Sequence, residues 1–340
     1  MKYLSVCSGI EAATVAWHSL GWQPAGFAEI EKFPSQVLAH HYPNVTNFGD
    51  MTKFKEWNLE SVELLAGGTP CQSFSVAGLR RGLDDPRGNL ALTYCGILDK
   101  FRPKWCVWEN VPGVLSSNGG RDFGSFLGAL GELGYGWSYR VLDAQYFGVA
   151  QRRKRVFVVG CFGDWSASAK VLFEPESLRG NTPQSREKKQ ETTGDTPQSI
   201  VYEMHPADSR VKLMGDICQT VTSRWGTGGG NVPLVQAFRK SRRAQTVDDY
   251  ETWVDDGKAN TLNTFDVGDV RTTHLVAEFD DVRRLLPVEV ERLQGFPDGY
   301  TDIPGATDLA RYKALGNSMA VPVMAWIGKR IKEYEQTAST

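Results

Sequence analysis

The sequence predicts an α/β fold in its first half, followed by an irregular, β-rich region. Short apolar runs alternate with helical patterns as far as residue 163, which is typical of a parallel sheet covered by helices on both faces. Glycine accounts for 35 of 340 residues, which indicates many tight turns or close approaches of backbone to a ligand. Hydrophobic residues make up 41% of the chain. This is enough for a packed core, so a wholly disordered chain is excluded.

Six strands and several helices are expected from local patterns. A helix over Glu11–Leu20 should end at Gly21, and apolar faces predict helices within 90–101 and 123–133, the latter stopping at Gly134. Helical periodicity returns over Pro287–Gln294 and in the last segment of the chain. The expected strands are Tyr3–Cys7, Ala25–Glu29, Val62–Gly67, Trp105–Glu109, Trp137–Leu142 and Val156–Cys161.

The composition and the pattern of the sequence change after residue 163. Residues 174–199 are polar and contain Thr-Pro-Gln-Ser twice, which favours a flexible linker or an insertion. From 200 to about 277, short extended pieces alternate with Gly- and Asn-rich turns. We therefore expect one domain from 1–163 and about 300–340, and a smaller, irregular, β-rich domain from about 164–299.

Composition excludes several classes of protein. The formal charge of −2 excludes a uniformly basic nucleic-acid coat. The six cysteines form no Cys-x-x-Cys pair, so neither a zinc ribbon nor a redox dithiol is expected, and no metal site is predicted. No apolar run approaches the roughly 18 residues of a membrane span, and Glu11 interrupts any signal-peptide core. The expectation is a cytoplasmic protein that does not bind membranes.

Ligand sites of such sheets lie outside the carboxyl ends of the strands. The first strand opens into a helix through a turn that contains Gly9, and Glu29 ends the next strand 20 residues later. At this spacing a carboxylate can bind both hydroxyls of a ribose, but the same residue could simply cap the following helix. Asp50 could be a third ligand contact or an ordinary turn residue.

Cys71 lies in the most informative segment, Gly-Gly-Thr-Pro-Cys-Gln-Ser-Phe-Ser at 67–75. The segment follows a buried strand and is bent by glycine and proline. A buried cysteine is usually a small hydrophobic residue, but this one has no apolar neighbours at strand or helix spacing, which favours a nucleophile. A free thiol with a pKa of about 8.5 is only partly ionised at neutral pH, so a working nucleophile needs positive neighbours or a helix N-terminus.

Glu109 and a run of cations supply further candidate groups. Glu109 emerges at the carboxyl end of the apolar strand Trp105–Glu109, where a raised pKa would suit a proton donor; alternatively it caps the next helix. The four cations Arg152 to Arg155 precede another strand. Such a run is usually a solvated face, but beside an acid, a thiol and a polyanionic substrate the cations would act as ligands.

Five blocks in order resemble the DNA cytosine-5 methyltransferases, of a compact bacterial or phage type. The resemblance covers about 1–163 and 283–335 and leaves the middle unmatched, where that family's target-recognition region would lie. The blocks are GGTPCQSFS at 67–75, WENV at 108–111, QRRKR at 151–155, RLQGFP at 292–297 and GNS at 316–318.

The resemblance implies a Rossmann-like, S-adenosylmethionine-dependent methyltransferase. Cys71 matches the nucleophile that attacks carbon 6 of a flipped-out cytosine, Glu109 the acid at ring nitrogen 3, and Arg155 the cation at the exocyclic oxygen, with Arg153 as a second arginine of that block. The sequence departs from the family pattern in two places: Cys7 replaces a phenylalanine, and Glu11-Ala12 replaces a pair of glycines. The implied cofactor-binding residues are Cys7, Gly9, Ile10, Glu29, Ile30, Asp50, Met51, Pro70, Leu90, Asn317 and Ser318.

Charge is distributed unevenly along the chain, as a DNA-binding surface requires. Residues 151–190 hold nine Lys or Arg against four Asp or Glu, whereas 244–281 hold ten acids and two bases. Phosphate contacts are expected from the first stretch and from the cluster at 239–243, although either could serve solubility alone. Base readout is expected within about 200–280. The expected DNA-binding residues are Gln72, Ser75, Arg224, Arg239, Lys240, Arg242 and Arg243.

The expected partner is double-stranded DNA, bound by a monomer, and the sequence carries no mark of an accompanying restriction nuclease. Three other interpretations stay open at this point. A nicotinamide oxidoreductase would explain Gly9 and Glu29 but not the Cys71 segment. A non-catalytic DNA-binding protein would have no need of Cys71, Glu109 and Arg155. An RNA cytosine-5 methyltransferase could use the same scaffold, because discrimination of the 2′-hydroxyl is not visible in the sequence.

Overall fold

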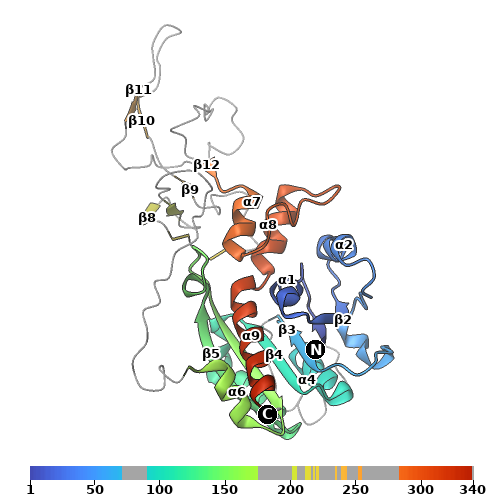
Figure 1. Cartoon of the computed structure of the whole chain (residues 1–340). Coiled ribbons are helices and arrows are strands. Elements are labelled where there is room, and N and C mark those ends of the chain that lie inside the picture. The colour runs from blue at the N-terminus through green and yellow to red at the C-terminus, as the bar shows by residue number, and fades with distance from the viewer. Residues whose placement is uncertain are drawn as a thin grey trace. The chain divides into compact units, whose positions relative to one another are not determined.

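The structure is a computed structural model (Figure 1). The chain divides into two units, the first comprising Met1–Gly148, Arg153–Glu187 and Ser318–Thr340, and the second Val149–Arg152 and Lys188–Asn317. The proposed domain bounds at 163, 299 and 300 stay a prediction. The structure describes residues 1–70, 90–174, 201–204, 211–215, 217–218, 220–221, 234–235, 239–242, 252–254 and 283–338.

A six-stranded sheet forms the centre of the first unit, in the order β2-β1-β3-β4-β6-β5. The four strands β2, β1, β3 and β4 pair in parallel, whereas β6 is antiparallel to both of its neighbours. The α/β class is confirmed, but the expectation of a wholly parallel sheet is wrong at β6. The strands are β1 (Lys2–Val6), β2 (Gln23–Ala28), β3 (Leu64–Gly67), β4 (Trp105–Asn110), β5 (Tyr135–Asp143) and β6 (Lys154–Phe162).

The reversal of β6 follows from a short connection. Only residues 144–153 separate β5 from β6, and a parallel crossover needs about a dozen residues or more, usually with a helix. The chain therefore turns back at this point. As a consequence the beginning of β6 lies beside the end of β4, with Asn110 paired to Val156 and Glu109 to Phe157.

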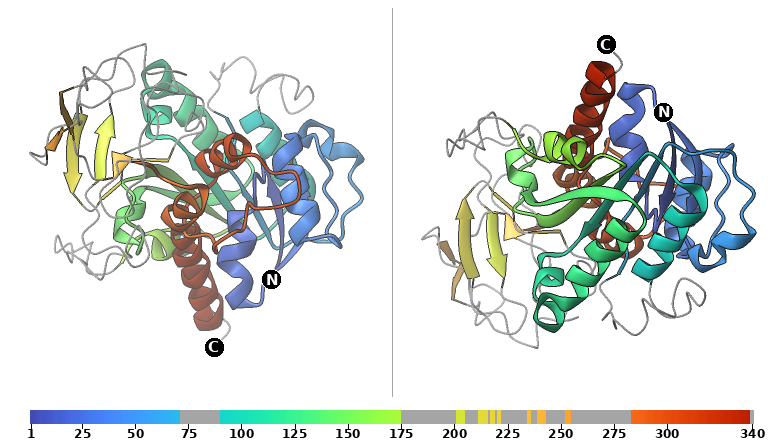
Figure 2. Two further views of the ribbon diagram at one scale, coloured as in Figure 1. Left: turned by 90° about the horizontal axis from the view of Figure 1, so that it is seen from above. Right: turned by 90° about the horizontal axis from the view of Figure 1, so that it is seen from below.

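Helices cover both faces of the sheet (Figure 2). On one face Trp17 of α1 donates from its indole nitrogen to the carbonyl of Met324 in α9 at 2.8 Å, and α6 packs against β5, β6 and α9. On the other face α4 and α5 pack on a core that includes Leu65 and Trp108. These helices are α1 (Ala12–Trp17), α4 (Leu90–Phe101), α5 (Arg121–Glu132), α6 (Trp165–Leu172) and α9 (Val321–Ala338), and α2 (Lys32–His41) follows β2.

Short 3-10 turns complete the first unit: η1 (His18–Leu20), η2 (Met51–Glu56), η3 (Pro112–Leu115), η4 (Ser117–Gly120) and η5 (Ala144–Tyr146). The helix expected over Glu11–Leu20 is thus α1 followed by η1, and Gly21 ends it with a φ of 73°. Positive φ is the conformation that glycine adopts without strain.

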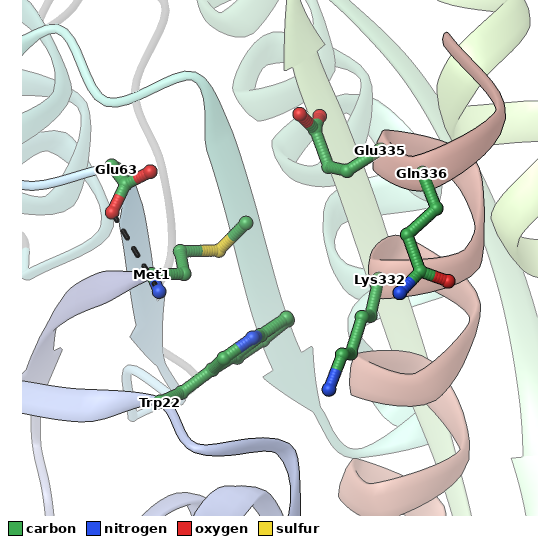
Figure 3. Close-up of a pocket in the computed structure, with 6 residues that line it drawn as sticks. All are labelled: Met1, Trp22, Glu63, Lys332, Glu335 and Gln336. Atoms are coloured by element: carbon green, nitrogen blue, oxygen red, sulfur yellow. Dashed lines mark ion pairs between the residues drawn. The ribbon is translucent and has the colours of Figure 1, made fainter. Parts of the chain in front are cut away.

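An open pocket of about 500 Å³ lies at the edge of the sheet where β1 begins (Figure 3). Met1, Trp22 and Glu63 line one side of it, and residues of the C-terminal part of α9 the other. The amino terminus lies 3.9 Å from a carboxylate oxygen of Glu63. This edge is opposite to the carboxyl ends of the parallel strands, so the pocket is remote from the predicted chemistry.

The described part of the second unit contains two helices and short strands. α7 (Pro287–Gln294) begins where Glu289 accepts from the backbone N–H of Leu286 at 2.7 Å and ends at Gly295, whose φ is 81°. α8 is Asp308–Asn317. The strands are β7 (Val201–Met204), β8 (Val211–Gly215), β9 (Leu234–Val235) and β12 (Arg283–Arg284) in one sheet, and β10 (Arg239–Arg242) with β11 (Thr252–Val254) in another.

Gln151 is a buried polar residue that joins three segments of the second unit. Its amide nitrogen donates to the carbonyl of Leu293 at 2.8 Å, and its amide oxygen accepts from the backbone of Val221 at 2.8 Å. Next to it, the hydroxyl of Thr220 donates to the carbonyl of Arg152 at 2.5 Å. Residues 149–152 therefore belong with the second unit, while Arg153 to Arg155 of the same block belong with the first.

Membrane-spanning helices and metal clusters are both absent from the residues that the structure describes. Within these ranges no helix combines the length and the apolar character that crossing a bilayer requires. The same ranges contain no group of three or more His, Cys, Asp or Glu side chains arranged to hold a metal ion.

Candidate active site

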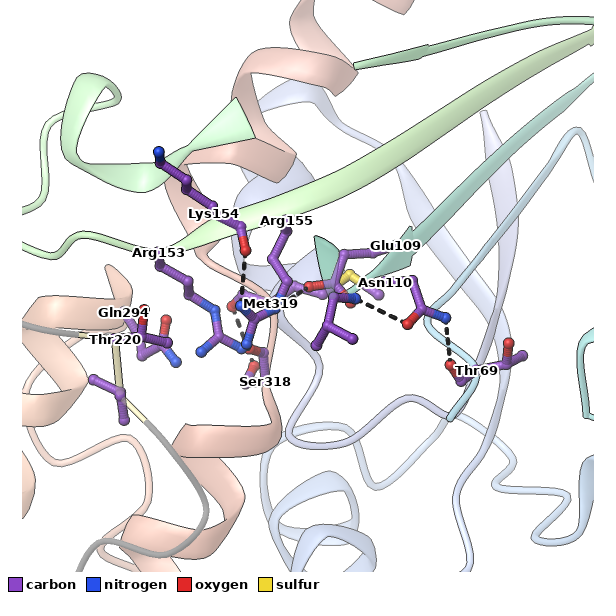
Figure 4. Close-up of polar contacts among 12 residues, drawn as sticks. Thr69, Glu109, Asn110, Arg153, Lys154, Arg155, Thr220, Gln294, Ser318 and Met319 are labelled. Carbon is purple, nitrogen blue, oxygen red and sulfur yellow. Dashed lines mark hydrogen bonds and ion pairs between the residues drawn. The ribbon is translucent and has the colours of Figure 1, made fainter. Parts of the chain in front are cut away.

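Glu109 and Arg155 meet at the carboxyl end of β4 (Figure 4). The Nε atom of Arg155 lies 3.2 Å from Oε1 of Glu109, and both side chains are largely buried, with exposed fractions of 16% and 13%. The Nη1 atom of Arg155 also donates to the carbonyl of Lys154 at 2.8 Å. The pair exists because β6 runs antiparallel to β4, which brings the start of one strand to the end of the other.

Arg153 is buried beside this pair. Its Nη2 atom donates to the carbonyl of Ser318 at 2.6 Å, and its backbone N–H donates to Oδ1 of Asp143 at 3.0 Å. Burial lowers the pKa of the Arg153 guanidinium to about 9, so the group stays cationic at neutral pH. A charged side chain that is 3% exposed and bonded to a main-chain carbonyl is a fixed positive charge.

Burial raises the pKa of the Glu109 carboxyl, and the charges of Arg153 and Arg155 act in the opposite direction. A carboxyl of this kind keeps a proton available nearer to neutral pH, as a general acid requires. Gly68 lies directly against it: a Cβ built there would be 3.0 Å from Oε2 of Glu109 and 3.2 Å from its carbonyl oxygen. A side chain at 68 would therefore require the Glu109 carboxyl to shift by a few tenths of an ångström.

The segment that leads to Cys71 leaves β3 at the same edge. Gly67 ends β3, Thr69 is 3% exposed, and Pro70 is exposed. The neighbouring strand holds this segment, because the side-chain amide of Asn110 donates to the carbonyl of Thr69 at 2.9 Å. Cys71, Gln72 and Ser75 lie outside the described residues, so their expected roles stay predictions.

The other cysteines of the first unit are poor nucleophiles. Cys7, Cys95, Cys106 and Cys161 are all free thiols. Burial raises the pKa of Cys7 and of Cys95 to about 12, that of Cys161 to about 11, and that of Cys106 further still. A thiol that holds its proton so strongly is inert at neutral pH.

The loop after β1 has the properties of a ligand cradle. Gly9 has a φ of +57°, and a Cβ built there would meet nothing within 4 Å. Its backbone N–H donates to Oε2 of Glu29 at 2.8 Å, and the other carboxylate oxygen of Glu29 accepts from the backbone of Glu31 at 2.7 Å. Glu29 is therefore held beside an open backbone, which fits a ribose-binding carboxylate. Ile10, next to Gly9, is fully buried.

The remaining residues expected to bind the cofactor are found in several places. Cys7 has a φ of 48° and donates from its sulfur to that of Met51 at 3.4 Å. Ile30 is 73% exposed next to Glu29. Asp50 caps η2 by accepting from the backbone and hydroxyl of Thr52 at 2.9 and 2.8 Å. Leu90 begins α4, Ser318 is 5% exposed, and Asn317 ends α8 in the second unit.

The expected DNA-binding residues are only partly described. Arg239, Lys240 and Arg242 form most of β10, which pairs antiparallel with β11. Arg224 and Arg243 lie outside the described residues. The assignment of these positions to DNA contacts stays a prediction.

The contacts that three residues make in the site were not expected from the sequence. Ser318 was expected to bind cofactor, but its carbonyl also accepts from Arg153. Gly68 was part of a quoted block without a role of its own. Trp108 donates from its indole nitrogen to the hydroxyl of Thr69 at 3.0 Å. A signal existed for Trp108, since a tryptophan preceding the strand-end acid is a large donor that must find a partner when buried.

Comparison with known proteins identifies the fold and the family of the chain. The fold is similar to that of the DNMT2 protein of Spodoptera frugiperda, with a TM-score of 0.62 and 18% identity over 97% of this chain and 99% of that one. A Rossmann-like methyltransferase fold is thereby confirmed. The family model described as C-5 cytosine-specific DNA methylase matches residues 1–333. The chain belongs to this family.

Two relatives of the chain are methyltransferases that differ in length and in the base that their names specify or leave open. The type II methyltransferase M.HpaII of Haemophilus parainfluenzae is 28% identical over 97% of this chain and 89% of that protein. A protein of Escherichia phage P1 named DNA N-6-adenine-methyltransferase is 36% identical, and the match covers 97% of this chain and 61% of that protein. The chain thus spans about three fifths of the length of the P1 relative.

Proposed function

We propose that the protein transfers a methyl group to carbon 5 of a flipped-out cytosine within a specific sequence of double-stranded DNA. The observation that carries the proposal is the meeting of Glu109, Arg155 and Arg153 at the sheet edge from which the segment leading to Cys71 departs. An oxidoreductase would leave this arrangement without a purpose. A protein that only binds DNA would not need a buried carboxyl with a raised pKa.

Cys71 forms the covalent bond in the proposed reaction. Its thiolate attacks carbon 6 while ring nitrogen 3 takes a proton from Glu109, so the electrons of the 5,6 double bond become available at carbon 5. Once carbon 5 has taken the methyl group and the rest of the donor has left as a neutral thioether, a base takes the proton from carbon 5 and the bond between sulfur and carbon 6 breaks. Ring nitrogen 3 then returns its proton to the Glu109 carboxylate. The thiolate is released and the ring regains its aromaticity.

The charged side chains hold the base and set the protonation of the acid. Arg155 lies against Glu109, and we assign it the binding of the exocyclic oxygen of cytosine, where negative charge increases. Arg153 is fixed to the carbonyl of Ser318 and adds positive potential without moving. Such preorganised charge stabilises a transition state because little reorganisation is needed during the reaction.

The residues of the first loops fit the methyl donor. S-adenosylmethionine supplies an electrophilic methyl group when it is bound. Glu29 would hold its ribose hydroxyls, Gly9 would allow close approach of the methionine part, and Asp50 would face the adenine amino group. Ile30 offers an exposed apolar side chain beside Glu29. Cys7 cannot stack on the adenine as an aromatic residue would. Apolar contact with the adenine would therefore come from neighbouring side chains such as Ile30.

We further propose that the region 164–299 recognises the target sequence. Arg224 is the proposed reader of a base edge, since arginine binds guanine with two hydrogen bonds worth about 1–3 kcal/mol of discrimination. Arg242, in β10, is proposed to bind a phosphate. The Arg224→Ala variant should then accept additional bases at one target position, whereas Arg242→Ala should weaken all sequences alike and lower the salt slope by about one. Methylation profiling of a random DNA library at two salt concentrations compares them.

The main experiment is expression in bacteria that lack cytosine methylation. Bisulfite sequencing of their DNA should show methylcytosine at one sequence, and the Cys71→Ser variant should show none. Nucleoside mass spectrometry of the DNA and RNA from the same cells tests the other outcomes. Methylation of adenine, as the name of the P1 relative states for that protein, or methylcytosine in RNA alone would contradict the proposal.

A further inference from the structure

Two buried side chains contact Thr69, which lies two residues before Cys71. The indole Nε1 of Trp108 donates to the hydroxyl of Thr69 at 3.0 Å, and the side-chain amide of Asn110 donates to the carbonyl of Thr69 at 2.9 Å. Thr69, Trp108 and Asn110 are 3%, 0% and 5% exposed. Figure 4 shows Asn110 and Thr69 in contact. We call these two hydrogen bonds the Thr69 clasp.

Both donors of the clasp are held in place by further contacts. The ring of Trp108 lies 4.3 Å from that of Phe126 and 6.3 Å from that of Phe123, measured between centroids. The side-chain oxygen of Asn110 accepts from the backbone of Val111 at 2.8 Å, which orients its amide. The clasp therefore joins Thr69 to a rigid part of the core rather than to mobile side chains.

The backbone before Cys71 is restricted in two ways. Pro70 has a fixed φ and restricts the backbone of the residue before it to extended conformations. The clasp fixes Thr69 at both its side chain and its carbonyl. Together these constraints restrict the backbone of Thr69 and Pro70, the two residues that precede Cys71.

The two donors also flank Glu109 on β4. Trp108 and Asn110 are its immediate neighbours in sequence, so the strand that carries the proposed acid also holds the start of the segment that carries the proposed nucleophile. Two groups that act on one cytosine ring need a defined separation. A misplacement of about 1 Å can lower a rate by about 100-fold.

We propose that the Thr69 clasp is a positioning device that sets Cys71 relative to Glu109. The inference rests on the proposed function, because it assigns Cys71 the attack on carbon 6. Thr69 and Trp108 are positioning residues that act through Cys71 and do not themselves touch the base.

A double-mutant cycle separates positioning from simple stabilisation. Thr69→Val removes the hydroxyl and keeps the β-branch, and Trp108→Phe removes the indole N–H and keeps an aromatic ring. Each single variant leaves a buried partner unpaired and should melt at a lower temperature than the wild type, whereas the double variant removes both partners and should recover most of the loss. Thermal denaturation of all four proteins measures this part.

The second readout is the rate at which the protein forms a covalent adduct with DNA that contains 5-fluorocytosine. The adduct rate should be about 10-fold or more below wild type in both single variants and stay there in the double variant. The KM for DNA should change little while kcat falls. Thr69→Ser retains the hydroxyl and should restore the rate.

Recovery of the adduct rate together with stability in the double variant would overturn the inference, since the clasp would then only stabilise the fold. An unchanged adduct rate in Thr69→Val would do the same, and this comparison with Thr69→Ser stands even if Trp108→Phe does not fold. Failure of the proposed function looks different: the Cys71→Ser variant would then methylate DNA as fast as the wild type.

Discussion

The buried carboxyl of Glu11 should make the stability of the protein depend on pH. Glu11 is fully buried, adopts a left-handed backbone conformation with a φ of 66°, and caps α1, where its Oε1 accepts from the backbone and the hydroxyl of Thr14, both at 3.1 Å. Burial raises its pKa from 4.5 to about 7, and the charge of Glu29 acts in the same direction. The folded protein therefore favours the neutral acid.

The size and the sign of the change in unfolding free energy with pH follow from the raised pKa of Glu11. A pKa difference of one corresponds to about 1.4 kcal/mol, so a rise from 4.5 to about 7 is worth about 3 kcal/mol. Because the folded pKa is the higher one, this stabilisation is complete below pH 4.5 and is lost as the pH rises to about 7. Glu11→Gln resembles the neutral acid at every pH. The variant should match the wild type near pH 4.5 and exceed its unfolding free energy by up to about 3 kcal/mol at pH 8.

Urea denaturation followed by circular dichroism at pH 5, 6, 7 and 8 measures the difference. Glu132→Gln, at the exposed end of α5, is the control for the same chemical change on the surface, and its curve should stay parallel to that of the wild type. Parallel curves for Glu11→Gln as well would refute the reasoning, because they would show that Glu11 is ionised in the folded protein as readily as in the unfolded chain.

Three further predictions concern the site. Glu109→Gln should lower the methylation rate by about 10²–10⁴-fold with little change in DNA affinity, as measured by single-turnover kinetics and filter binding. Gly68→Ala should lower kcat because its Cβ would lie 3.0 Å from the Glu109 carboxyl, whereas Gly124→Ala, where a Cβ meets nothing within 4 Å, should leave initial rates unchanged. Glu29→Ala should weaken S-adenosylmethionine binding in calorimetry and leave kcat at saturating cofactor nearly unaltered, because a charge-assisted hydrogen bond to ribose is lost.

The sequence located the strands of the sheet to within about two residues, because apolar runs bounded by glycine and charge are local signals. It did not show the direction of β6 (Lys154–Phe162), because pairing direction depends on how the connection to β5 closes. Three of the helices in the described residues, α2, α6 and α8, were not expected from the sequence. In α2 (Lys32–His41) only Val37 and Leu38 are buried, so no apolar face is visible in the sequence.

The site could be predicted in part. Glu109 was identified because it ends an apolar strand, and Arg153 and Arg155 because four cations precede another. The sequence could not show that Arg153 bonds to Ser318, 165 positions away, because this contact depends on how α9 packs against the sheet. The partner of Trp108 could not be predicted either, because its bond to Thr69 depends on how β4 pairs with β3.

The direction of β6 explains how the cationic block comes to serve the acid. In a wholly parallel sheet, the residues that precede a strand lie at the edge opposite the ligand site, and a cationic run there would face solvent. Reversing one strand moves Arg155 to the carboxyl end of β4, within 3.2 Å of Glu109. The reversal also uses a connection of only ten residues, 144–153, whose last residue is the buried Arg153. The short connection therefore both forces the strand to reverse and brings two guanidinium groups to Glu109. Residues that a parallel sheet would separate thus meet at one edge.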